Sequence, residues 1–171
     1  VIATITLAFV MLFSFDAHAQ KFAGLDKSPL DIAYYKTSRN APPIARVIYS
    51  RPQLKGRDVK ALTQKDQVWR TGANESTEIT FYSDVTFGGK SIKAGTYTLH
   101  TIADDSEWTI ILNSDLHTWG SYSYDKAKDV ARIKAKVTEG KDNLEAFSIT
   151  FSNGNMHMGW GNLRVAVPVS K

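Results

Sequence analysis

The chain contains no cysteine among its 171 residues. This absence excludes disulfide bridges, thiolate nucleophiles and zinc–thiolate sites, so stability must come from a hydrophobic core. The hydrophobic share of 43% and the charged share of 22% are ordinary for a globular protein and argue against disorder. The length suits one domain with a substantial core.

The common catalytic and metal-binding signatures are also missing. The sequence has no Gly-x-Ser-x-Gly elbow, no His-Glu-x-x-His motif and no glycine loop of the phosphate-binding kind. None of His100, His117 and His157 is paired at metal-ligand spacing with another histidine, so we expect no metal and no cofactor.

Charge argues against a nucleic-acid partner. The formal net charge is only +4, and Lys and Arg are scattered apart from Arg132, Lys134 and Lys136. Those three bases alternate with Ile133 and Ala135, which is typical of the solvated face of a strand.

Residues 1–19 are expected to be a cleaved signal peptide. An apolar run from Val1 to Phe15 precedes Ala17-His18-Ala19, a small-x-small site before Gln20. The run is short for a membrane span, which needs about 20 residues, so we expect no stable span after cleavage; an uncleaved anchor is the alternative. We therefore expect export to the periplasm or the extracellular space.

The remaining chain predicts an all-β fold. Pro-rich residues 20–43 are expected to form an irregular arm that docks through Tyr34 and Tyr35, and residues 44–171 a single β-domain. About ten short strands alternate apolar and polar residues, with turns such as Gly88-Gly89 and Asn153-Gly154, and a further turn expected at 140–143. This pattern favours an antiparallel sandwich of jelly-roll type, with an up-and-down barrel as the alternative.

The best candidate site is the stretch from residue 68 to 82. Trp69, Arg70, Asn74 and Glu75 surround Gly72 in what we expect to be a tight loop between two strands. Loops held by rigid strands often carry binding and catalytic groups. Three readings stay open: Arg70 braces the turn through Glu75 or Glu78 with Trp69 capping the core, the loop contacts a ligand, or it is catalytic.

Four other residues complete the candidate set. Trp119 and Tyr122 lie in an aromatic segment, 119–124, expected to be a strand whose rings face either a core or a ligand. Arg51 and Arg57 belong to a basic, turn-rich stretch that either holds an anion or is a solvated turn.

Several strings resemble the bacterial family known as domain of unknown function 2911. The resemblance rests on 25–29, 48–52, 55–57, 94–97, 107–109, 119–124 with Asp129, and above all 68–75 with its Trp-Arg-Thr-Gly-Ala-Asn-Glu core. It spans about 25–168 and implies an exported β-rich protein, with no activity attached. The chain departs from the family pattern at 58–66, and at His100-Thr101-Ile102-Ala103, where members tend to have Phe-Thr-Ile-Pro.

The most economical functional hypothesis is a non-enzymatic module that binds a carbohydrate or another small envelope ligand. Indole and phenol rings stack on sugar faces while Arg and Asn bond hydroxyls, which requires Trp69 and Trp119 to be accessible on one concave surface. One alternative is a small hydrolase with a carboxylate pair such as Glu75 and Asp129, since glycoside hydrolysis needs two carboxyls about 5 to 10 Å apart. Another is an envelope scaffold that binds a protein partner of unknown identity through an apolar patch or an unpaired edge strand.

Overall fold

The computed structural model describes residues 20–171, so the expected signal peptide at 1–19 lies outside the described residues. The elements in chain order are β1 (Leu30–Tyr35), β2 (Ala45–Ser50), α1 (Val59–Thr63), β3 (Val68–Trp69), β4 (Thr77–Phe81), β5 (Val85–Phe87), β6 (Lys90–Ile92), β7 (Gly95–Ala103), β8 (Glu107–Asn113), the 3-10 turn η1 (Lys126–Lys128), β9 (Asp129–Ser152) and β10 (Asn155–Ser170).

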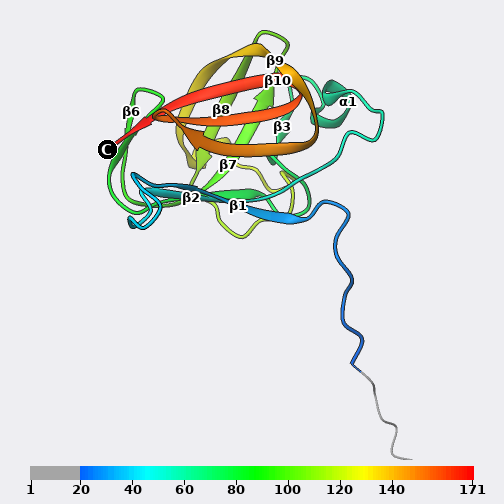
Figure 1. Ribbon diagram of the computed structural model, residues 1–171, viewed down its shortest axis with the longest axis horizontal. Helices are drawn as coiled ribbons and strands as arrows, with labels where there is room; N and C mark the ends of the chain where they lie inside the picture. Colours follow the sequence, from blue (N-terminus) through cyan, green and yellow to red (C-terminus); the bar gives the residue numbers. More distant parts are fainter. Residues whose placement is uncertain (1–19) are drawn as a thin grey trace, which may run out of the picture.

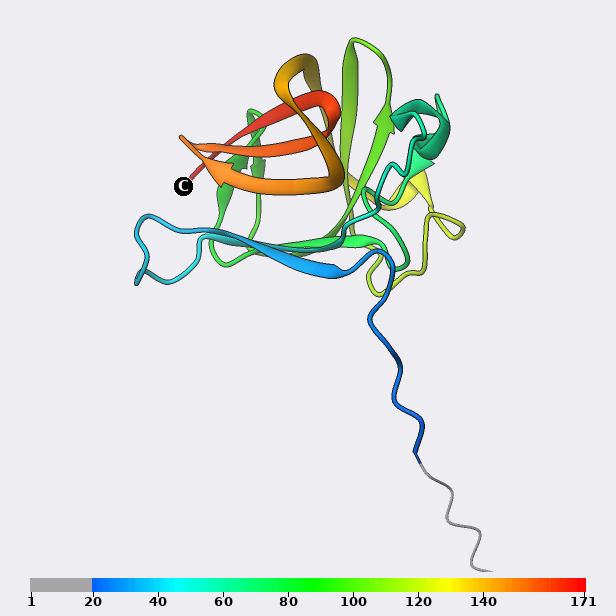
Figure 2. The same cartoon turned by 45° about the vertical axis from the view of Figure 1, so that its right-hand side comes forward.

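All ten strands belong to one antiparallel sheet, which confirms the all-β prediction. Its order is β1-β2-β4-β7-β8-β9-β10-β5-β6, with β3 paired to β7, so β1 and β6 form its two edges. The sheet is strongly curled and brings β9 and β10 over the first strands (Figures 1 and 2). The layering expected of a sandwich therefore arises within a single curled sheet that does not close.

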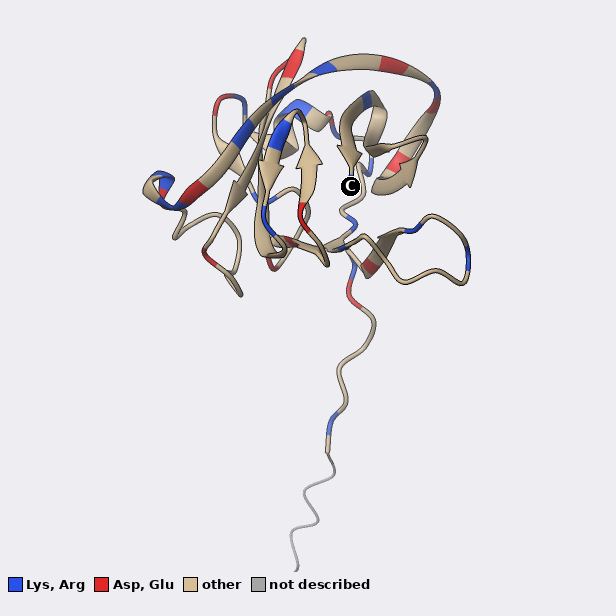
Figure 3. Ribbon diagram, turned by 90° about the vertical axis from the view of Figure 1, so that its left-hand side faces the viewer, with Lys and Arg blue, Asp and Glu red and all other residues tan. Residues whose placement is uncertain are grey.

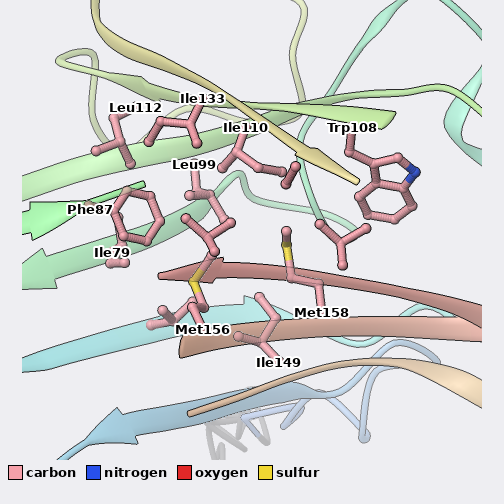
Figure 4. Close-up of a cluster of buried hydrophobic side chains, with 14 of the residues drawn as sticks. Ile79, Phe87, Leu99, Trp108, Ile110, Leu112, Ile133, Ile149, Met156 and Met158 are labelled. Atoms are coloured by element: carbon pink, nitrogen blue, oxygen red, sulfur yellow. The ribbon is translucent and has the colours of Figure 1, made fainter. Parts of the chain in front are cut away.

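The core fills the space between the two halves of this sheet. Ile79, Leu99 and Ile110 come from β4, β7 and β8, and they face Ile149 of β9 and Met158 of β10 (Figure 4). All five are buried. Ile79 and Ile149 alternate with polar residues, as the period-two pattern predicts for strands with one buried face, whereas Ile110 lies in β8, which is buried on both faces.

Four aromatic side chains make the centre of one end of the core. The Trp69 ring stacks on Trp160 at 5.6 Å between centroids and meets Phe147 and Trp108 edge-on, at 5.1 and 6.1 Å. Such edge and offset contacts add to the free energy gained by burying the rings. Because the four residues come from β3, β8, β9 and β10, this cluster joins both halves of the sheet.

Side-chain contacts stabilise the curl of the sheet where strands pack together without pairing through their backbones. The Tyr49 hydroxyl of β2 accepts a bond from the Ile149 amide at 2.9 Å and donates to the Ile149 carbonyl at 3.3 Å. The Tyr35 ring of β1 stacks on Phe151 at 5.4 Å. These contacts tie β1 and β2 to the second half of β9.

The N-terminal region differs from the expectation. Residues 30–35, expected in an irregular arm, form β1 and pair with all six residues of β2. Tyr35 packs against the core as expected, whereas Tyr34 is exposed and lies under the Lys36 ammonium, 5.2 Å from its ring centroid. An irregular arm is therefore wrong for these six residues.

Two further local expectations are wrong. The turn expected at 140–143 is absent because β9 runs unbroken for 24 residues, changing partner from β8 to β10 along its length. Residues 119–124 are a turn-rich loop, and their one strand-like contact is a bridge between Trp119 and Glu75. The Gly88-Gly89 and Asn153-Gly154 hairpin turns are confirmed, with positive φ at all four residues.

Candidate functional site

The loop between β3 and β4 is fixed from inside the fold. The Trp69 indole N–H donates to the Gly72 carbonyl at 3.1 Å, and the Thr77 hydroxyl donates to the Thr71 carbonyl at 2.8 Å. A Cβ at Gly72 would lie 3.0 Å from the Ser50 carbonyl oxygen, so only glycine fits there without a shift. Thr71 has φ of 54°, a sparsely populated conformation for a β-branched residue. The loop backbone is therefore held rigidly against the core.

A second loop, residues 114–125, lies against this first one. The Ser76 amide donates to the Thr118 carbonyl at 2.9 Å, and the Gly120 amide donates to the Asn74 carbonyl at 3.0 Å. The Ser76 hydroxyl also donates to the Gly120 carbonyl. These bonds place the side chain of Trp119 beside the β3–β4 loop.

A pocket of about 590 Å³ opens between these loops and the outer face of β1 and β2. This volume lies in the range of small-molecule sites. The pocket is lined by Asp26, Ser28, Leu30, Ile48, Tyr49, Ser50, Asn74, Glu75, Ser76, Glu78, His117, Thr118 and Trp119. We call it the Trp119 pocket.

Its polar groups are arranged on two sides. The Glu78 carboxylate accepts from the His117 amide at 2.8 Å and lies 3.2 Å from the His117 Nδ1. The Asn74 amide donates to Asp26 at 3.0 Å. Bonds from the Ser28 backbone and from Asn74 lower the pKa of Asp26, so that carboxyl is ionised at neutral pH.

The comparisons with known proteins identify the family. The family model described as "Protein of unknown function (DUF2911)" matches residues 32–169, which is most of the chain. The chain belongs to the DUF2911 family. No curated protein and no solved structure matches it. The resemblance stated from the sequence is confirmed.

The Trp119 pocket of this DUF2911 protein contains three of the eight predicted site residues. Asn74, Glu75 and Trp119 line it together, and the Trp119 ring is 58% exposed. Sequence reasoning did not place Asp26, Glu78 and His117 in the site. For Glu78 the sequence did contain a signal for the site: the alternation of β4 places this side chain on the outer face, at the end of the strand that follows the loop.

Trp69, Arg70 and Tyr122 lie outside this pocket. Trp69 is only 7% exposed, so the expected platform shared by Trp69 and Trp119 is wrong. Arg70 and the exposed Tyr122 line a separate hollow of about 430 Å³. The expected pairing of Arg70 with Glu75 or Glu78 is also wrong, because its guanidinium donates to the Asn74 carbonyl at 3.1 Å. Trp69 does cap the core, as the brace reading required.

The two other predicted arginines bond to their own surroundings. Arg51 donates to the Phe147 carbonyl and pairs with Asp31 at 3.1 Å, which joins β1 to β9. Arg57 donates to the carbonyls of Leu54 and Gln53 and so closes its own turn. Neither residue lines the Trp119 pocket.

A half-buried polar cluster lies under the 114–125 loop. The Asp129 carboxylate accepts from Tyr124 at 2.7 Å, from Arg132 at 2.7 Å and from Asn113 at 2.9 Å. Burial, followed by the bond to Asp129 and its charge, raises the pKa of Tyr124 to about 12. Asp129 is thus engaged by three neighbours and does not share a pocket with Glu75, as a Glu75–Asp129 hydrolase would need.

His100 packs on this cluster, with its ring 5.2 Å from that of Tyr124. It is 3% exposed, and its Nδ1 has no hydrogen-bond partner among the described residues. Burial lowers the pKa of His100 to about 4, against a smaller opposing effect of the Asp129 charge. His100 is therefore neutral at physiological pH.

Residues 20–171 contain neither a metal-binding cluster nor a helix able to span a membrane. Within that range no three or more His, Asp or Glu side chains lie close enough to hold a metal ion. In the same range no helix is sufficiently long and apolar to cross a membrane.

Proposed function

We propose that this protein is an exported module that binds a carbohydrate or another small envelope ligand in the Trp119 pocket. The observation that carries the proposal is the half-exposed Trp119 ring on the wall of a concave site of about 590 Å³. Folding usually hides an indole, and a large aromatic side chain left in an open pocket is typical of ligand contact.

The wall around the ring supports this function. Leu30 and Ile48 supply apolar surface, while the Asn74 amide and the Ser28 hydroxyl line the same site. A mostly apolar pocket with a few fixed polar groups binds and orients small molecules. The bonds from the core to the β3–β4 loop hold this wall in place without a ligand, which lowers the entropic cost of binding.

The test is a thermal-shift and calorimetric screen of the purified protein against neutral, acidic and amino sugars and small aromatic compounds. Trp119→Ala should abolish the response to any compound that binds. Tyr122→Ala is the matched control, because Tyr122 is 84% exposed in the same loop as Trp119 but lies outside the pocket. Ligands that bind both variants equally, or a screen without any binder, would overturn the proposal.

The edge of the sheet favours a second candidate, a protein partner. Leu30, Ile32 and Tyr34 project from one face of the edge strand β1 and are 63, 44 and 46% exposed. An edge strand with exposed apolar side chains can pair with another chain. Cross-linking in intact cells, with Ile32→Lys as the variant expected to lose the cross-link, tests this candidate.

A further inference from the structure

The charges around the Trp119 pocket have one sign. Asp26, Glu75 and Glu78 line it, and no Lys or Arg of residues 20–171 does. The whole chain has the opposite balance, with 21 basic and 17 acidic residues, and its charged positions are scattered over the fold (Figure 3). An acidic pocket in a basic protein therefore reflects local placement rather than overall composition.

Two of these carboxylates have free capacity to accept hydrogen bonds. Both contacts of Glu78 with His117 use Oε1, and Oε2 has no partner among the described residues. Glu75 is exposed and has no side-chain partner among residues 20–171, although its backbone is fixed by the bridge to Trp119. Acceptors without protein donors are matched by a ligand that brings donors of its own.

The third component is the aromatic ring. The Trp119 indole lines the same pocket as the Glu75 and Glu78 carboxylates. A cation near an indole face is attracted by the negative charge of the ring face. Aromatic surface and carboxylates thus favour the same class of ligand.

The spacing of the acidic groups argues for an organic cation. No group of three or more His, Asp or Glu within residues 20–171 converges closely enough to hold a metal ion. The acidic side chains instead surround a volume of about 590 Å³ with apolar surface from Leu30 and Ile48. This arrangement suits a positive charge carried on an apolar or ring-shaped body.

We propose that the ligand of the Trp119 pocket is a small organic cation, a primary amine or guanidinium attached to a sugar ring or an apolar group. This inference rests on the proposed function and adds the charge of the ligand to it. It predicts that an ammonium group increases affinity over its neutral counterpart by about tenfold, which corresponds to about 1.4 kcal/mol.

The experiment compares matched probes by calorimetry: glucosamine with glucose, and phenethylamine with 2-phenylethanol. The amines should bind more tightly, and their advantage should shrink as ionic strength rises from about 0.02 to about 0.5 M, because salt screens exposed charges. The double variant Glu75→Gln/Glu78→Gln should lose the advantage of the amines. Glu139→Gln, at an exposed carboxylate of β9 outside the pocket, should keep it.

The outcomes separate the two proposals. Equal binding of amines and neutral probes, lost together in Trp119→Ala, would overturn the cationic ligand and leave a binding module. An amine advantage that survives in the double variant would also overturn the inference. No binding of any probe or screened compound would overturn both. The salt dependence is measured on the unmodified protein, so the inference stays falsifiable even if the double variant fails to fold.

Discussion

Replacing the buried His100 by phenylalanine should remove a specific acid sensitivity of the fold. His100 is 3% exposed, and burial lowers its pKa from 6.5 to about 4. Phenylalanine is close in shape and keeps a ring against Tyr124. His100→Phe is therefore expected to fold.

The direction in which stability changes with pH depends on whether the folded or the unfolded state binds the proton. Well above pH 6.5 His100 is neutral in both the folded and the unfolded state, so it adds no pH dependence there. Between pH 6.5 and about 4 the unfolded chain takes up a proton that the folded chain refuses, so the free energy of unfolding falls as pH falls. The full loss is about 3 kcal/mol, and about 2 kcal/mol of it has occurred by roughly pH 5.

The assay is urea unfolding of the wild type and His100→Phe at about pH 7.5 and about pH 5. All other ionisable groups are common to both proteins, so the comparison of the two pH differences isolates the histidine. The wild type should lose about 2 kcal/mol more than the variant on acidification. His157→Phe, at a half-exposed histidine of β10, is the control that leaves His100 in place. Equal losses in the wild type and His100→Phe would refute the reasoning.

Four other substitutions test the fold. Tyr49→Phe removes the hydroxyl that bonds both backbone groups of Ile149, and should lower the free energy of unfolding by about 1–2 kcal/mol; an unchanged urea midpoint would contradict this. Trp69→Ala removes a ring from the centre of the aromatic cluster and should lower the free energy of unfolding by about 3–5 kcal/mol. Trp119→Ala, at an exposed ring, should lower it by less than about 1 kcal/mol. Similar losses for the two would refute the contrast between core and pocket. Gly88→Ala should cost about 1–3 kcal/mol in thermal unfolding, because φ is +56° and a Cβ would contact a buried isoleucine; an unchanged melting temperature would speak against this.

The strands could be predicted because their signals are local. Alternation of apolar and polar residues shows which face of β4 or of the start of β9 is buried, and Asn153-Gly154 specifies a hairpin through its own backbone preferences. The strand order could not be predicted, since β5, the partner of β6, also pairs with β10 at the far end of the chain. Such a pairing depends on how the sheet curls, which no local pattern encodes.

The conformations of β1 and of residues 119–124 were predicted wrongly for the same reason. β1 lies at an edge with exposed residues on one face, so its sequence lacks the strong alternation of a half-buried strand. In 119–124 the aromatic spacing imitated a strand, but the segment bonds to the β3–β4 loop through Gly120, whose φ of +70° does not suit a strand. In both segments tertiary contacts, and not local propensity, decide the conformation.

Some residues of the stretch from β3 to β4 face the core and others face the pocket, because side chains alternate between the two faces of a sheet. Trp69 points into the core from β3, and its indole bonds back to Gly72, so the most conspicuous side chain of the stretch serves packing. The positive φ at Asn74 then turns the chain so that Asn74 and Glu75 reach the opposite face. Trp69 and the turn residues Asn74 and Glu75 are therefore close in sequence but lie on different sides of the sheet. A sequence motif can thus be rich in binding-type residues while only its turn contributes to the pocket, and the ring that completes the site, Trp119, comes from a loop 45 residues away.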